Sequence, residues 1–201
     1  MKITFRTPRS PLFRARKDHF SWSFKARVCA LLLLFTGISN AIFGQTFVHP
    51  GALNTQADFD RIKAKVAAGE SPWYDSYVTL CDDPLSSLSH VWGPVPQIIR
   101  GGAGSNFSHS QIEAICIYEM ALRWRLSGDT RYADKAIEGM DAWSSTMNTI
   151  PVGTDGMLAI GLCGYEFAVA GETLRGYSGW SQTSINNYKT FLGYFASGIV
   201  N

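Results

Sequence analysis

The stretch ALRWRLSGDTRYADKAIEGMDAW, residues 121–143, contains two apolar helical faces separated by the break Ser127-Gly128-Asp129-Thr130. Apolar residues recur every three or four positions up to Trp124, and the same spacing resumes after the break and continues to Trp143. This spacing is typical of helices that bury one face. Glycine often ends a helix, and we expect Thr130 to cap the next one. The stretch therefore predicts a helical hairpin whose apolar positions form core.

The same helical spacing returns on both sides of this hairpin. A capping-box pattern at Thr55 and Asp58 starts an earlier helix, and Gly69 ends it. Short and long connections alternate, which is typical of antiparallel helical hairpins, and strand-like alternation persists nowhere. We therefore expect an all-α fold. Its further helices are predicted from Ser71-Pro72, from about Ser108, over 155–174 and over 181–198.

The segment from Cys81 to about Phe107 lacks helical periodicity and is rich in proline and glycine. Irregular segments of this length within compact domains are usually functional or disordered. We expect a long loop here and regard it as a candidate region for substrate contacts.

The first 44 residues have a different composition. They contain eight basic residues and one acidic residue, Asp18, and an uncharged segment runs over 28–48. A basic start, a short apolar core and small residues near 39–44 are typical of a secretory signal peptide. A membrane anchor is the alternative, but a span needs about 20 apolar residues, and polar residues dilute this run. We therefore expect residues 1–44 to be removed, leaving a secreted protein, extracellular or periplasmic, without stable membrane insertion.

Removal of this leader changes the net charge. The whole chain has 18 basic and 16 acidic residues, and the leader's 8 and 1 leave 10 and 15, a net charge of −5. A basic surface for nucleic acid is therefore not expected. An anionic ligand would have to be held by local basic groups.

Three cysteines remain beyond the leader, at positions 81, 116 and 163. Cys116 and Cys163 lie in apolar helical patterns, where a thiol mostly behaves as a small hydrophobic group. One disulfide is compatible with export, and the sequence leaves its pairing open. The spacing does not predict a zinc site, and we expect no metal and no cofactor.

Three of the four histidines also lie beyond the leader. His49 precedes Pro50 and is interpreted as part of a local turn. His90 shares the long loop with Trp92, where an aromatic ring is suited to stacking on a sugar. His109 lies near a predicted helix start.

Three blocks of the chain resemble the amino-terminal half of alginate-lyase-domain proteins. They are FVHPGALNTQADFDRIKAKVAAGESPW (47–73), the hairpin at 121–143, and GYEFAVAGETLRGYSGW (164–180). Members of that family are secreted polysaccharide lyases with an (α/α) toroid fold that act on uronic-acid polymers such as alginate or glucuronan. The resemblance covers residues 47–201 and implies a lyase that cleaves an anionic polysaccharide by β-elimination.

The resemblance also implies that residues 45–201 form an incomplete toroid. The family's Asn-His pair and its Tyr and Arg residues on later helices have no match in this sequence, and we expect them after residue 201. The catalytic residues are therefore unknown, and the 201-residue chain alone is expected to be inactive.

Such a lyase removes the proton at C5 of a uronic acid and expels the oxygen at C4. This requires a group that offsets the carboxylate charge, together with a general base and a general acid within hydrogen-bond reach. Arg100, isolated in the stretch Ile-Ile-Arg-Gly-Gly, is a candidate for binding the carboxylate because a guanidinium pairs with carboxylates in bidentate fashion. The alternative is a surface arginine whose stem packs on the fold.

Three further side chains are candidate substrate contacts. Asn106 and His109 flank a predicted helix start, where backbone N–H groups favour anions, although capping alone also accounts for Asn106. Tyr165 lies in the apolar stretch 161–170 beside Glu166. Glu166 needs a partner in such surroundings, so it is either a structural hydrogen-bond hub or a site residue.

Two other functions remain open at this stage. A noncatalytic helical carbohydrate-binding or scaffold module would need no base and acid. A toroidal glycoside hydrolase would need two carboxylates flanking one bond, and Asp155 and Glu166 are the candidate pair.

Overall fold

The structure is a computed structural model that describes the backbone of residues 47–200 and the side chains of residues 47–198. Residues 47–201 form a unit distinct from residues 1–46. The expected signal peptide, residues 1–44, lies outside the described residues. Within 47–200 the regular structure is helical, and the one strand-like contact is an isolated bridge between Ile99 and Val152. The all-α prediction is confirmed.

Six α-helices and one 3₁₀ turn follow one another along the described chain. The helix expected near Ser108 begins one residue earlier, and the one expected at 181 begins one residue later. The elements are α2 (Gln56–Ala67), α3 (Trp73–Asp82), η1 (Pro84–Ser86), α4 (Phe107–Ser127), α5 (Thr130–Thr146), α6 (Gly156–Thr173) and α7 (Gln182–Val200).

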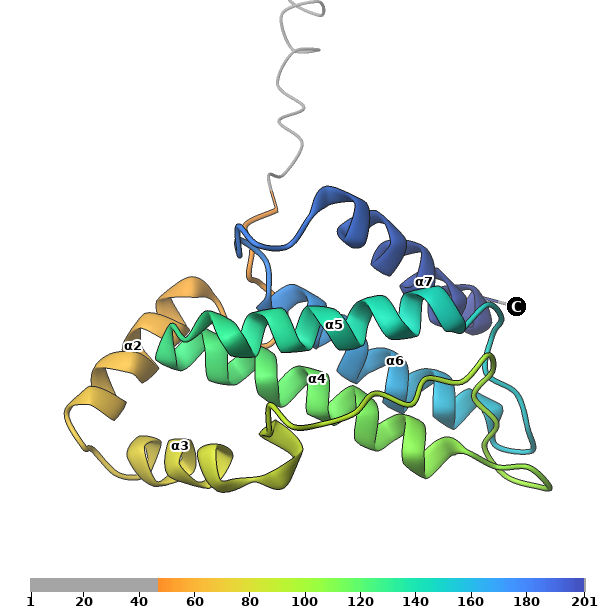
Figure 1. Ribbon diagram of the computed structural model, residues 1–201, viewed down its shortest axis with the longest axis horizontal. Helices are drawn as coiled ribbons and strands as arrows, with labels where there is room; N and C mark the ends of the chain where they lie inside the picture. Colours follow the sequence, from red (N-terminus) through yellow and green to blue (C-terminus); the bar gives the residue numbers. More distant parts are fainter. Residues whose placement is uncertain (1–46, 201) are drawn as a thin grey trace, which may run out of the picture. The chain divides into compact units, whose positions relative to one another are not determined.

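The four longest helices form two layers. α4 packs against α5 and α6, and α7 packs against α5 and α6. Figure 1 shows that α4 and α6 run in the same direction, with α5 and α7 running the opposite way. α2 and α3 make a separate hairpin that contacts α4. The chain thus repeats a helical hairpin twice, and the two copies stack side by side.

Aromatic rings fill the core between the layers. The ring centroids of Trp143 and Phe167 lie 5.3 Å apart, and those of Phe167 and Phe191 lie 4.9 Å apart in an edge-to-face arrangement. Such pairs add stabilisation beyond the area that they bury. Ala133 and Ala136 are fully buried on α5, which lets α4 and α5 approach closely, as expected for the core of the hairpin.

The turn between α4 and α5 depends on two residues. Gly128 follows α4 with a left-handed φ of 79°, and its N–H donates to the carbonyl of Trp124 at 2.7 Å. The N-cap of α5 is Asp129, whose carboxylate accepts from the backbone N–H of Arg131 at 3.1 Å. The expectation that Thr130 caps this helix is wrong. Aspartate caps as well as threonine and also places negative charge at the helix N-terminus.

The earlier helix has the cap that the sequence predicts. The Thr55 side chain accepts from the backbone N–H of Asp58, whose own carboxylate accepts from the backbone N–H of Thr55. This capping box fixes where α2 begins. Segment 47–54 precedes this cap and therefore ends where the helix begins.

Helix α6 is apolar on nearly all sides. One face lies in the core, and Met157, Leu158, Leu162 and Tyr165 are exposed on another. None of the helices within residues 47–200 is long and apolar enough to cross a membrane.

Candidate functional site

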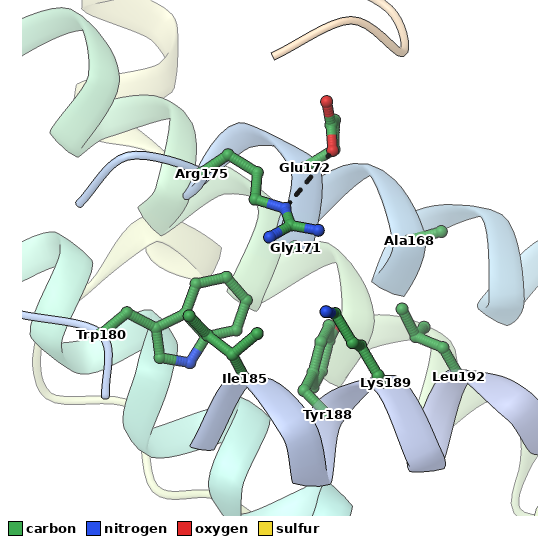
Figure 2. A pocket seen from close by; sticks show the side chains of 9 residues that line it. All are labelled: Ala168, Gly171, Glu172, Arg175, Trp180, Ile185, Tyr188, Lys189 and Leu192. Atoms are coloured by element: carbon green, nitrogen blue, oxygen red, sulfur yellow. Dashed lines mark ion pairs between the residues drawn. The ribbon is translucent and has the colours of Figure 1, made fainter. Parts of the chain in front are cut away.

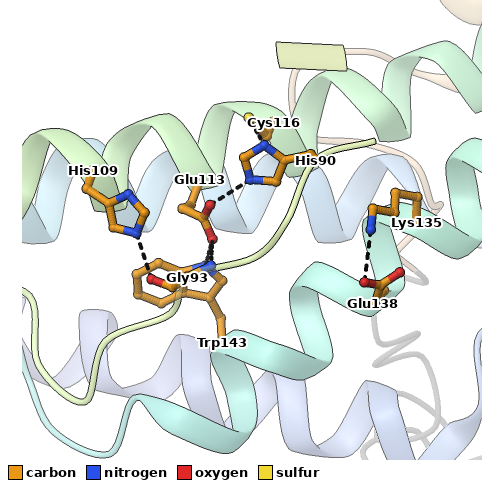
Figure 3. A network of polar contacts seen from close by, with 8 residues as sticks. All are labelled: His90, Gly93, His109, Glu113, Cys116, Lys135, Glu138 and Trp143. Atoms are coloured by element: carbon orange, nitrogen blue, oxygen red, sulfur yellow. Dashed lines mark hydrogen bonds and ion pairs between the residues drawn. The ribbon is translucent and has the colours of Figure 1, made fainter. Parts of the chain in front are cut away.

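A buried carboxylate organises the long loop between η1 and α4. Glu113 lies on the core-facing side of α4 and is 1 % exposed. Its Oε1 is 2.6 Å from His90 Nε2, and its Oε2 accepts from Gly93 N at 3.0 Å and from Trp143 Nε1 at 3.2 Å (Figure 3). Because each oxygen has a donor, the carboxylate is satisfied inside the fold. Glu113 therefore pins the loop against both α4 and α5.

Two more contacts extend this network. His109 Nε2 lies 2.6 Å from the carbonyl oxygen of Gly93, and Cys116 Sγ lies 3.8 Å from His90 Nδ1. The order Cys116, His90, Glu113 has the connectivity of a thiol nucleophile, a base and an orienting acid. Cys116 is fully buried, however, and burial followed by the neighbouring Glu113 raises the pKa of its thiol to about 12. The thiol stays protonated at neutral pH, so the network holds structure and supplies no nucleophile.

Trp92, expected as a sugar-stacking residue, packs within the fold. Its ring meets the His90 ring edge-on at a centroid distance of 4.5 Å, and Lys135 Nζ lies 5.6 Å from the Trp92 centroid. The indole Nε1 is buried and has no hydrogen-bond partner in the described part of the chain. The loop uses both aromatic side chains to attach itself to α4 and α5.

Arg100 occupies the far part of the same loop. Its Nη1 donates to Asp155 Oδ2 at 2.7 Å, and its guanidinium carbon lies 4.8 Å from the centroid of Phe107. The backbone N–H of Asp155 donates to the carbonyl of Arg100 at 3.2 Å. The predicted carboxylate-binding arginine thus pairs with a carboxylate of its own chain, at the N-terminus of α6. Asp155 is 51 % exposed, so this ion pair faces solvent.

Asn106 holds the loop in shape. Its Oδ1 accepts from Ile99 N at 2.8 Å, and its Nδ2 donates to the carbonyl of Gln97 at 2.9 Å. Asn106 occupies the N-cap position of α4, but its side chain makes no capping hydrogen bond. Arg100, Asn106 and His109 therefore lie at one end of the α4–α6 layer. Two of these three side chains bond to loop backbone.

Tyr165 is separate from these residues. It lies nine residues after the start of α6 at Gly156, roughly 14 Å along the helix axis. Tyr165 is 53 % exposed and lines a hollow of about 500 Å³ with Phe47, Leu53 and Val169. The structure does not bring Tyr165 together with the predicted contacts of the loop.

Glu166 is not the buried acid of this fold. It is half-buried, and burial raises the pKa of its carboxyl while a hydrogen bond from Gln111 lowers it. Glu113 is buried instead, and the sequence contains a signal for it, because Glu113 shares a helical face with Ile117 and Met120. Sequence reasoning missed that Glu113 interrupts this apolar face.

His49 makes a long-range contact and not the local turn contact that was expected. Its Nδ1 lies 2.7 Å from Glu172 Oε1, and the same oxygen accepts from Gly51 N at 2.8 Å. Glu172 belongs to the last turn of α6. These bonds fasten segment 47–54 to the end of α6 opposite to Arg100.

The remaining groups with possible chemistry are the cysteines and the potential metal ligands. Cys81, Cys116 and Cys163 are free thiols. Among residues 47–198 no group of three or more His, Cys, Asp or Glu side chains is placed to hold a metal ion.

Comparison with protein-family models, with curated proteins and with solved structures found no match to this chain. The resemblance to alginate-lyase-domain proteins, and the activity that it implies, therefore stay predictions.

Proposed function

We propose that this chain is a secreted protein that contributes the amino-terminal part of a uronic-acid polysaccharide lyase with an (α/α) toroid fold. The arrangement of α4 and α6 in one layer and α5 and α7 in the other supports the toroid, because stacked helical hairpins with parallel layers build such rings. The resemblance of the three sequence blocks supports the substrate class. The proposed leader, residues 1–44, would be absent from protein recovered from the medium, as its intact mass would show.

The observation that carries the lyase proposal is the exposed ion pair of Arg100 with Asp155. β-Elimination needs a group beside the C5 carboxylate that offsets its charge and makes the C5 proton acidic, and a guanidinium can supply this. Arg100 is held in place by Phe107 and by backbone bonds, and its partner carboxylate is half exposed. A substrate carboxylate can replace Asp155 without creating a new buried charge. We assign Arg100 to carboxylate binding and assign no base or acid within residues 47–198.

The hydrogen bonds of the histidines favour the noncatalytic alternative. His90 and His109 both hydrogen-bond within the fold, to Glu113 and to the Gly93 carbonyl. A chain whose imidazoles serve structure would bind the polymer without cleaving it.

The hydrolase alternative is disfavoured by distance. Asp155 and Glu166 are eleven residues apart along α6, roughly 16 Å of helix. Glycosidase carboxylates stand about 5–9.5 Å apart. These two carboxylates are too far apart to act on one bond.

Three measurements on one sample separate these functions. The full chain would be incubated with polymannuronate, polyguluronate, glucuronan and neutral amylose, and binding, ultraviolet absorbance of unsaturated uronate and new reducing ends would be followed. We expect binding to uronic-acid polymers and not to amylose. Unsaturated product would place the base and acid within this chain, whereas binding without product would favour the noncatalytic module.

Two arginine variants make the test specific. Arg100→Ala should weaken polymer binding roughly tenfold, the scale of one charge-assisted pair. Arg131→Ala removes an exposed arginine that pairs with Asp129 and should leave binding unchanged. Equal binding of amylose and uronic-acid polymers would overturn the proposal, and so would reducing ends that form without absorbance.

A further inference from the structure

A small cavity lies between the C-terminal part of α6 and the first turns of α7, at the end of α6 opposite to Arg100. Its volume is about 90 Å³, and Figure 2 shows its lining side chains. Trp180 and Tyr188 form nearly buried walls, 7 % and 2 % exposed. The Tyr188 hydroxyl donates to the Phe167 carbonyl at 2.7 Å, and Trp180 Nε1 donates to Ser184 Oγ at 2.7 Å. The two aromatic rings are therefore fixed in place.

Two cations stand at this cavity. Arg175 follows α6, and Lys189 comes from α7. In Figure 2 the charged heads of both side chains point toward the same gap. Lys189 has no ion pair or hydrogen bond in the part of the chain that the structure describes.

The nearby carboxylate does not neutralise both cations. Glu172 Oε2 lies 3.8 Å from Arg175 Nε, beyond good hydrogen-bond distance. Glu172 Oε1 is already occupied by His49 Nδ1 and Gly51 N, at 2.7 Å and 2.8 Å. Arg175 and Lys189 thus share one carboxylate, which also interacts with the charge of Arg125 and whose other oxygen is committed to segment 47–54. Arg175, Lys189 and Glu172 together leave one unmatched positive charge.

We infer that this cavity binds the carboxylate group of an anionic ligand between Arg175 and Lys189. One unmatched positive charge suits a monoanion, whereas a doubly charged phosphate would leave excess negative charge beside Glu172. A guanidinium pairs with a carboxylate through two parallel hydrogen bonds. The nearly buried Trp180 and Tyr188 rings limit the access of water from the side of the fold, which strengthens both interactions.

The size of the cavity limits what enters it. Pockets that enclose a whole ligand have volumes of about 300–1,000 Å³, so a cavity of about 90 Å³ suits a carboxylate and the carbon that carries it better than a whole sugar ring. The rest of the ligand would lie outside, over the exposed Lys189 stem. A uronic acid residue and a free carboxylic acid both offer this group.

The choice of a uronic acid as the source rests on the proposed function, but carboxylate binding does not. α6 has 18 residues, about 27 Å of helix, between the Arg100 end and this cavity. A polysaccharide that touched both ends would therefore span several sugars. The cavity would act as a distant subsite, separate from any chemistry at Arg100.

Nuclear magnetic resonance of the Trp180 indole N–H tests the inference directly. The signal would be assigned by its loss in Trp180→Phe, and the full chain would be titrated with sodium glucuronate, sodium acetate, inorganic phosphate and glucose. We expect glucuronate and acetate to shift the signal and glucose to leave it in place. Tighter binding of glucuronate than of acetate would identify a uronic acid as the source, and equal binding would identify free carboxylates.

Charge variants provide the controls. Arg175→Gln and Lys189→Gln should each weaken glucuronate binding roughly five- to tenfold, the effect of one partly exposed charge. Glu172→Gln keeps an acceptor for Gly51 N and should tighten binding a few-fold. Lys63→Gln, an exposed lysine on α2, should change nothing.

Three results would overturn the inference. They are no Trp180 shift with either carboxylate, phosphate binding tighter than both carboxylates, and unchanged affinity in the double variant R175Q/K189Q. Far-ultraviolet circular dichroism would confirm that each variant is folded. The chain could bind glucuronate and yet neither bind nor cleave a uronic-acid polymer. That result would contradict the proposed function and still support the carboxylate site.

Discussion

Glu113 Oε1 and His90 Nε2 lie 2.6 Å apart, although the residues are separated by 23 positions. This pair joins a loop without regular structure to the buried face of α4. The second oxygen of Glu113 binds Gly93 N and Trp143 Nε1, so one carboxylate fixes the loop at two points and ties it to α5. The position of the loop, and hence of Arg100, depends on this buried group.

Replacement of Glu113 should therefore destabilise the protein strongly. Glu113→Ala leaves the Trp143 indole N–H and the Gly93 N–H without an acceptor, and loss of a buried charged partner costs about 3–5 kcal/mol. Glu113→Gln keeps one acceptor and should cost less. Urea unfolding followed by circular dichroism would measure both, and protease cleavage within 87–106 should become faster.

The control for this change is Glu138→Gln. Glu138 is exposed on α5 and pairs with Lys135 at 2.9 Å, so its replacement should alter the free energy of unfolding by no more than about 0.5 kcal/mol. Equal costs for the Glu113 and Glu138 variants would show that the Glu113 network is not a structural pin.

Two helical glycines should respond to alanine in opposite directions. A Cβ at Gly139 would lie 2.7 Å from Trp92 Cζ2 and 2.8 Å from Ile117 Cγ1, so Gly139→Ala must displace the ring and should cost about 1–3 kcal/mol. A Cβ at Gly161 meets nothing within 4 Å, and Gly161→Ala should stabilise by about 0.4–1 kcal/mol. Thermal unfolding of both variants would show the difference, and destabilisation at Gly161 would contradict it.

Arg123 serves the fold and not a ligand. Its Nη1 donates to the Cys81 carbonyl at 3.3 Å and to Ser86 O and Oγ at 3.2 Å and 3.0 Å, and its guanidinium lies 4.0 Å from the Tyr132 centroid. Arg123→Ala should lower the free energy of unfolding by about 2–4 kcal/mol, from charged hydrogen bonds and a cation–π contact. Binding of uronic-acid polymers, measured on folded protein, should not change. A selective loss of binding would place Arg123 in the ligand site.

The hairpin between α4 and α5 could be predicted because its signals are local. The apolar spacing, the break at Gly128 and the small residues Ala133 and Ala136 lie within one short stretch. Even the error there was local, since Asp129 and Thr130 are adjacent and both suit the cap. The toroid expected from the resemblance is a larger arrangement than residues 47–200 describe, and it stays a prediction.

The candidate site was harder to predict because its contacts are distant in sequence. His49 meets Glu172 across 123 positions, and Arg100 meets Asp155 across 55. Neither pair leaves a periodic pattern, because each partner lies in a loop or at a helix end. Glu113 could be identified as a polar residue on an apolar face, but no local feature indicates that His90 is its partner.

The last prediction concerns pH and Glu119 on α4. Its Oε2 is buried without a hydrogen-bond partner in the part of the chain that the structure describes. Burial, with a smaller contribution from Asp83, raises the pKa of this carboxyl from 4.5 to about 7. Between these two values the folded protein keeps a proton that the unfolded chain loses. The free energy of unfolding should therefore fall as pH rises from about 4.5 to about 7, and this contribution should be level above that.

Glu119→Gln replaces the carboxyl by an amide that does not titrate, so the fall should be smaller in the variant. Part of it should remain, because burial also raises the pKa of Glu166. Thermal unfolding midpoints of both proteins, measured at intervals between about pH 4.5 and about pH 8, would reveal the difference. As the pH rises, the stability of the variant should increase relative to that of the native protein. At neutral pH the Glu119 carboxyl of the native protein must either carry a partly buried charge or bind a proton, and the amide of the variant does neither. Two parallel curves would show that Glu119 titrates as an ordinary surface carboxyl.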